Sequence, residues 1–230
     1  MKNLLIYKIL AELINTCNRI IRKICRYMLK LIRVIQDHYY DKKLGIDTSE
    51  SYFHTCDNSV SLYKDMHIHR PTPYAALRTI FNYLKPGHDD VFVDFGCGKG
   101  RVMFFAAGQG LKKVIGVELD QRLIDIAKEN LKKLKLNDTA VEILNMDASD
   151  FDAKSANIFF MFNPFGPRTF KSVLDNIKKS LIANPRKISI IYYSPEYKYL
   201  LDTEDWLVLD KRIEDEEISI WRNQDLNYAR

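Results

Sequence analysis

The sequence predicts an α/β protein with a mainly parallel β-sheet, preceded by a long amphipathic helix. From residue 74 onward, short apolar runs alternate with segments of helical period, as in strands joined by crossover helices. A glycine-rich turn follows the first apolar run. Residues 3–36 carry a continuous apolar stripe at helical spacing. We therefore divide the chain into an N-terminal arm (1–43), a connecting segment (44–70) and an α/β domain (71–230).

The size and composition are those of one globular domain with an appendage. The chain has 230 residues, of which 47% are hydrophobic and 28% charged, and this is enough for a full core. No two of its four cysteines form a C-x-x-C pair, and they are too widely spaced for a disulfide framework: Cys17, Cys25, Cys56 and Cys97. Reduced thiols and a cytoplasmic location are therefore expected.

The positive charge is concentrated in the arm. Residues 1–43 hold ten of the 35 Lys/Arg and three of the 30 Asp/Glu, which leaves 25 basic and 27 acidic residues for the rest of the chain. A domain without a basic excess does not match a protein that binds nucleic acid over its whole face. We therefore expect no nucleic-acid partner.

The arm is typical of an amphipathic helix, with Lys and Arg opposite the apolar stripe. Charged residues interrupt every window long enough to cross a membrane: Lys8, Glu12, Arg19 and Arg22. The arm also lacks the compact apolar core and cleavage site of a signal peptide. Two alternatives stay open. Either residues 3–36 pack on their own domain or on a second copy of the chain, or they lie on an anionic membrane at its inner face.

The connection between the arm and the domain predicts a lid over the site. Residues 37–70 have weak periodicity and many turn formers, yet several aromatic residues argue against plain disorder. We place the lid, which would help to form the substrate pocket, at residues 44–70. His67 and His69 fall in it, but two histidines without a third ligand predict no metal site.

The turn Asp94 to Arg101, DFGCGKGR, indicates a nucleotide-cofactor site. A buried strand precedes it, and a helix from Arg101 to Ala107 follows it. Glycines let the backbone turn sharply beside a ligand, and free N–H groups at a helix start favour negative charge. The glycine spacing is G-x-G-x-G, and residue 101 is Arg where a dinucleotide fingerprint has its third glycine. Arg101 is expected to start the helix and to be braced against a nearby acid.

The remaining elements follow in regular order. Thr72 is the expected N-cap, and Pro73 the first residue, of a helix that ends at Pro86-Gly87. Further strands are expected at 114–117, 141–144, 158–162 and 188–192, with helices at 121–135 and 168–181 and a terminal antiparallel hairpin. Glu118 ends the second strand, eighteen residues after Gly100, where its carboxylate would accept both ribose hydroxyl hydrogens of a cofactor.

With its acid two residues before the first glycine, the turn resembles motif I of the class I (seven-strand) S-adenosylmethionine-dependent methyltransferases. This resemblance implies a Rossmann-like sheet of order 3-2-1-4-5-7-6 with an antiparallel last strand. It implies S-adenosylmethionine as cofactor, with Asp147 at the adenine amino group and Ala148 beside it. The implied cofactor-binding residues are Thr72, Tyr74, Asp94, Gly96, Cys97, Gly98, Gly100, Glu118, Asp147, Ala148 and Asn163.

The stretch FNPFG after the fourth strand resembles the corresponding stretch of the non-SET histone-lysine methyltransferases and of small uncharacterised bacterial methyltransferases. The resemblance implies that the methyl acceptor lies at Asn163, Pro164 and Phe165, with Tyr193 at the next strand end as a further catalytic residue. The favoured function is N-methylation of an amine such as a protein lysine, the side-chain carbonyl of Asn163 accepting a hydrogen bond from the amine. O-methylation of a small-molecule or envelope substrate, and cofactor binding without catalysis, are the alternatives.

Overall fold

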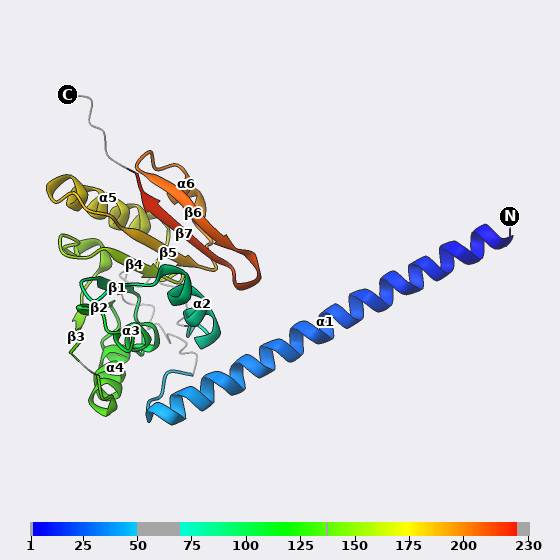
Figure 1. Ribbon diagram of the computed structural model, residues 1–230, viewed down its shortest axis with the longest axis horizontal. Coiled ribbons are helices and arrows are strands. Elements are labelled where there is room, and N and C mark those ends of the chain that lie inside the picture. The colour runs from blue at the N-terminus through cyan, green and yellow to red at the C-terminus, as the bar shows by residue number, and fades with distance from the viewer. Residues whose placement is uncertain (1, 50–69, 137, 225–230) are drawn as a thin grey trace, which may run out of the picture.

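The computed structural model describes residues 2–49, 70–136 and 138–224 (Figure 1). Most of the expected lid, with His67 and His69, lies outside the described residues. In the part of the chain that is described, a seven-stranded sheet with helices on both faces forms the body of the molecule, and a long helix extends from it.

The sheet has the order β3-β2-β1-β4-β5-β7-β6, which confirms the predicted topology and the Rossmann-like fold class. Strands β1 to β5 pair in parallel, whereas β7 is antiparallel to both β5 and β6. The strands span Val91–Phe95, Lys113–Glu118, Ala140–Asn145, Ile158–Met161, Ser189–Tyr193, Leu207–Ile213 and Ile218–Asn223 for β1 to β7. The central strands are buried along their whole length because helices cover both faces.

Two apolar cores separate the sheet from its helices. On one face α2 (Tyr74–Leu84), α3 (Arg101–Ala107) and α4 (Gln121–Lys133) pack on the sheet. On the other face lie α5 (Pro167–Ala183) and α6 (Lys198–Asp202). Short 3-10 helices η2 (Ala148–Asp150) and η3 (Glu214–Glu216) complete the described elements. The first turn of α3 directly follows the glycine turn, as the sequence predicts.

Helix α1 runs from Lys2 to Leu44, two turns beyond the apolar stripe of residues 3–36 (Figure 1). It therefore covers the described part of the arm assigned to residues 1–43, whereas the weak periodicity from residue 37 onward wrongly indicated a connection there. Only the last turns of α1 reach the domain, while Ile24 and Ile35 are 56% and 60% exposed. In its described part, the apolar stripe thus does not pack on its own domain. No helix among the described residues meets the length and hydropathy needed to cross a membrane.

The start of α2 differs from the prediction. The N-cap position belongs to Pro73, and Thr72 does not cap the helix. The backbone N–H of Tyr74, at the start of α2, instead donates to Asp37 Oδ1 of α1 at 2.9 Å. A carboxylate distant in sequence therefore satisfies a donor that a local side chain was expected to satisfy.

Candidate active site

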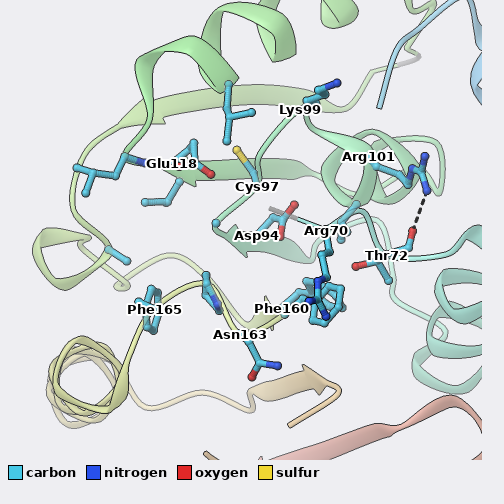
Figure 2. Close-up of a pocket in the computed structure, with 18 of the residues that line it drawn as sticks. Arg70, Thr72, Asp94, Cys97, Lys99, Arg101, Glu118, Phe160, Asn163 and Phe165 are labelled. Carbon is cyan, nitrogen blue, oxygen red and sulfur yellow. Dashed lines mark hydrogen bonds between the residues drawn. The ribbon is translucent and has the colours of Figure 1, made fainter. Parts of the chain in front are cut away.

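A cavity opens at the carboxyl ends of β1, β2 and β4, the edge where parallel sheets place their ligands (Figure 2). Most of the residues that the sequence singled out line it: Thr72, Asp94, Gly96, Cys97, Glu118, Asp147, Ala148, Asn163, Pro164 and Phe165. Four others do not line it: Tyr74, Gly98, Gly100 and Tyr193. The structure therefore brings the glycine turn, the acids and the strand-four turn around one space.

The glycine turn packs directly against the turn after β4. Gly96 has φ +73°, and a Cβ on it would lie 2.4 Å from Pro164 Cβ. Its N–H and that of Cys97 both donate to the carbonyl of Val117, at 2.8 and 3.1 Å. Only glycine combines this left-handed backbone with such a close approach. Burial raises the pKa of the Cys97 thiol, which suits a small packing residue better than a nucleophile.

Gly98 and Gly100 shape the turn from behind the cavity wall. The Gly98 N–H donates to Glu118 Oε2 at 3.0 Å. Gly100 has φ +93°, and a Cβ there would meet the Phe104 ring at 2.4 Å. Their expected role at the cofactor is therefore indirect in this structure, through the conformation of the loop.

Glu118 is held rigidly at the end of β2. Besides the bond from Gly98, its Oε1 accepts the N–H groups of Leu119 at 2.8 Å and Asp120 at 2.9 Å. It is 6% exposed, and burial raises its pKa despite these three hydrogen bonds. A carboxylate has about four acceptor positions, so capacity remains for a hydroxyl donor from a ligand in the cavity.

Asp94 at the end of β1 carries a buried and unsatisfied oxygen. The residue is 2% exposed, and among the described side chains its Oδ2 is the buried polar atom that has no hydrogen-bond partner. Burial and the nearby charge of Glu118 raise its pKa to about 8. An orphaned carboxylate oxygen on a cavity wall fits a ligand that brings a cationic donor. The ammonium group of S-adenosylmethionine is such a donor.

Asp147 and Ala148 lie on the far wall, at the start of η2. Asp147 caps this short helix: its Oδ1 accepts from the backbone N–H and the hydroxyl of Ser149, at 2.8 and 2.7 Å. The carboxylate is thereby fixed in orientation beside the cavity. Asp150, the competing acid after the third strand, does not line the cavity.

The side chain of Asn163 is engaged elsewhere than the sequence predicts. Its Oδ1 accepts from the Tyr192 hydroxyl at 2.5 Å and from the Glu196 N–H at 3.3 Å, and its Nδ2 donates to the Ser194 carbonyl at 2.7 Å. Figure 2 shows the amide directed away from Asp94 and Glu118. The backbone of Asn163 has φ +42°, which turns the side chain toward the end of β5. The side-chain carbonyl of Asn163 therefore already accepts from two donors in this structure, whereas the sequence predicts that it accepts from the methyl acceptor.

Aromatic residues line the cavity on both sides of this turn. Phe160 and Phe162 line it from the core beneath α2 and α3, and Phe165 lines it from the core beneath α5. Tyr193 is 9% exposed, and its ring lies 4.7 Å from that of Phe162. Tyr193 does not line the cavity in this structure. Phe160 and Phe162 were missed, although alternation along a strand places both on one face.

A family model described as Conserved hypothetical protein 95 matches residues 61–221. The chain belongs to the Conserved hypothetical protein 95 family. Its fold is that of the class I methyltransferases, and a solved neighbour, the methyltransferase yhhF from Escherichia coli, superposes with a TM-score of 0.52 at 20% identity, over 67% of this chain and 90% of that one.

Two relatives of this family member have different acceptors in their names. One is an H3 lysine-79 specific histone-lysine N-methyltransferase from Dictyostelium discoideum, 35% identical over 47% of this chain and 7% of that protein. The other is ribosomal RNA small subunit methyltransferase D from Haemophilus influenzae, 28% identical over 62% of this chain and 77% of that protein. The fold is that of the class I S-adenosylmethionine-dependent methyltransferases, and both of these relatives are named as methyltransferases. The expectation that the protein has no nucleic-acid partner is not supported, because one of these relatives is named as a ribosomal RNA methyltransferase.

A network that we call the Arg101 clasp joins the family domain to α1, and its α1 residues lie outside the region that the family model matches. Arg101, 3% exposed, donates to Asp37 Oδ2 at 2.9 Å, to Asp41 Oδ2 at 3.2 Å and to Thr48 Oγ1 at 2.7 Å. Its guanidinium also lies 4.8 Å from the centre of the Tyr74 ring. The expectation that an acid braces Arg101 is confirmed.

The clasp explains why Tyr74 does not line the cavity. Its hydroxyl donates to Asp41 Oδ1 at 2.8 Å, and burial raises its pKa. Burial also raises the pKa of Asp37 despite the nearby Arg101. Asp41 accepts two more bonds from Thr48, whose own side chain lines the cavity together with Arg101. The last turns of α1 therefore form the second layer behind one cavity wall. Sequence reasoning missed Asp37, Asp41 and Thr48 because no local pattern connects them with the glycine turn.

Proposed function

We propose that the protein transfers a methyl group from S-adenosylmethionine to the side-chain amine of a protein lysine. The observation that carries this proposal is the aromatic lining of the cavity on both sides of the strand-four turn, with Phe160 and Phe162 on one side and Phe165 on the other. Methylation of an amine moves positive charge from the sulfonium to the nitrogen. Aromatic faces attract a cation within about 6 Å of the ring, so such a lining favours an amine over a hydroxyl acceptor, whose methylated product is neutral.

The acids of the cavity suit the polar parts of the cofactor. In this proposal, Asp94 accepts from the ammonium group, Glu118 from the ribose hydroxyls, and Asp147 from the adenine amino group. The cofactor supplies a methyl group that is already activated by the sulfonium. The chain itself has to bind, orient and desolvate the reactants, and alignment alone contributes up to ~7–11 kcal/mol to such a reaction.

The turn after β4 would hold neighbouring residues in place rather than contact the methyl acceptor through Asn163. Asn163 is anchored to β5 through Tyr192 and Ser194, and Pro164 packs on Gly96 of the glycine turn. These contacts hold Phe165 and the aromatic lining at a fixed place relative to the cofactor loop. A lysine must release its proton to solvent before attack, and burial of the amine beside the cofactor favours the neutral form because burial disfavours charge. The aromatic rings then stabilise the positive charge that develops on the nitrogen during transfer.

A second candidate acceptor is an amino group of RNA. The relative from Haemophilus influenzae favours it, because the match covers 77% of a protein named as a ribosomal RNA methyltransferase. The O-methylation alternative has no comparable support in the cavity.

The experiment is methyl transfer from tritiated S-adenosylmethionine to a cell lysate, followed by separation of protein, RNA, lipid and small molecules. The proposal predicts label in protein, released as methyllysine on hydrolysis and absent with Asp94→Asn. Label in RNA would establish the second candidate instead, and label in lipid or small molecules would overturn both.

A further inference from the structure

The exposed part of α1 has a clean division into two faces. The apolar side chains of the stripe between residues 17 and 35 recur at steps of one, three and four, and these are about half exposed: Ile20, Ile21, Ile24, Met28, Leu31, Ile32 and Ile35. Figure 1 shows the helix leaving the domain as a free rod. A contiguous exposed apolar surface of this kind marks an interaction site.

The charge on the same segment has one sign. Residues 13–36 contain Arg19, Arg22, Lys23, Arg26, Lys30 and Arg33 and no Asp or Glu. Coiled-coil helices carry complementary charges of both signs beside the apolar seam, whereas the charged residues of this segment are all basic, and they lie on the face opposite the stripe. A helix with an apolar face and a wholly basic polar face is typical of segments that lie on anionic lipid.

The contact between α1 and the domain lies on the side of the helix opposite the apolar stripe. Asp37 and Asp41 face the domain through the Arg101 clasp. Arg33 precedes Asp37 by one turn, so it shares that face, and the apolar stripe occupies the opposite one. A membrane against the stripe would therefore not collide with the domain at the anchor.

We propose that residues 16–36 of α1 lie in the interface of an anionic membrane. Their apolar face is buried at the acyl boundary, and the side chains of Arg19, Arg22, Lys23 and Arg33 reach the headgroups. The segment is ~30 Å long at 1.5 Å per residue, long enough to lie along the surface while the domain stays in water. The clasp then holds the candidate active site next to the membrane.

The test is co-sedimentation of the full-length protein with vesicles of phosphatidylcholine alone and with 30% phosphatidylglycerol. We expect binding at least about tenfold stronger to the anionic vesicles, and weakened by salt. The double variant Ile24→Ser, Ile35→Ser should lose about tenfold in binding. Ile182→Ser, an equally exposed apolar residue of α5 at 51%, is the matched control and should bind like the wild type.

Folding of each variant is checked by circular dichroism and by retained S-adenosylhomocysteine binding. Equal binding to neutral and anionic vesicles, or no binding to either, would overturn the proposal. The proposal would also be overturned if analytical ultracentrifugation showed the wild type as a dimer and the double variant as a monomer, while the wild type did not bind vesicles.

Discussion

Arg101 Nη1, at the first residue of α3, lies 2.9 Å from Asp37 Oδ2 in the last turns of α1. The two residues are 64 positions apart in the chain. Their ion pair connects a helix outside the family-matched region with the turn that shapes the candidate cofactor site. The arm is thus part of the structural support of the site, and substitutions in it should change the stability of the residues that form the site.

Removing one carboxylate from the clasp tests this support. Asp41→Ala leaves the guanidinium of Arg101 buried with one partner fewer and also removes the acceptor of Tyr74 and Thr48. Breaking a buried ion pair costs about 3–5 kcal/mol, and we expect a loss of that size in the free energy of unfolding, measured by urea denaturation. The control is Glu129→Gln, which breaks an exposed pair with Lys132 and should cost under about 1 kcal/mol. Equal effects of the two variants would refute the structural role of the clasp.

Gly96 tests the contact between the glycine turn and the strand-four turn. Gly96→Ala places a Cβ against Pro164, whereas Gly110→Ala has a similar positive φ, +78°, with nothing within 4 Å. Both variants pay the left-handed strain of about 1–2 kcal/mol, and only the first adds an overpacking cost of about 1–3 kcal/mol. We expect Gly96→Ala alone to weaken S-adenosylhomocysteine binding, by calorimetry, at least about tenfold. Identical affinities in both variants would show that the close contact has no role in the site.

Asp94 gives a pH dependence with a definite sign. Its pKa is about 8 in the folded protein against 3.8 in the unfolded chain, so the folded state holds a proton that the unfolded state releases. The stability due to the protonated carboxyl is complete below pH 4 and is lost as pH rises through about 8. Asp94→Asn removes this titration.

The free energy of unfolding of Asp94→Asn relative to wild type should therefore increase between pH 4 and 8, by at most about 1.4 kcal/mol per pH unit. Chemical denaturation at a series of pH values measures it. A constant difference across that range would mean that Asp94 is ionised in the free protein.

Asn163 is expected to act by positioning. Asn163→Gly keeps the positive φ without strain but removes the bonds to Tyr192 and Ser194. We expect kcat to fall about 100-fold while the affinity for S-adenosylhomocysteine changes less than about threefold. Tyr192→Phe removes the hydroxyl that donates to Asn163 Oδ1 and lies outside the cavity, and it should also lower kcat. Full activity in Tyr192→Phe with an inactive Asn163→Gly would point to direct contact of Asn163 with the acceptor.

The fold could be predicted well because its signals are local. Strands appear as short apolar runs and helices as amphipathic periods, and the order of the sheet follows from the resemblance carried by the glycine turn. Asp94 and Glu118 could be found for a similar reason: they end parallel strands, and all such ends meet at one edge. The structure places both on the cavity.

The errors concern side-chain direction and long-range partners. Asn163 does follow β4, but its positive φ aims the amide at β5, which spacing does not reveal. Tyr74 starts α2 as expected, yet Asp41 draws its hydroxyl away from the cavity. The acids that pair with Arg101 lie at the end of the arm, beyond the apolar stripe, where weak periodicity and nearby turn formers such as Gly45 give no sign of a helix that faces the domain.

Titration calorimetry of the full-length protein with S-adenosylmethionine is the most direct test of the central claim, that the cavity at β1, β2 and β4 is the cofactor site. We predict one molecule bound per chain, at least about 100-fold weaker binding in Asp94→Asn, and wild-type affinity in the exposed control Asp125→Asn. Wild-type affinity in Asp94→Asn, or no binding by the wild type, would contradict this assignment.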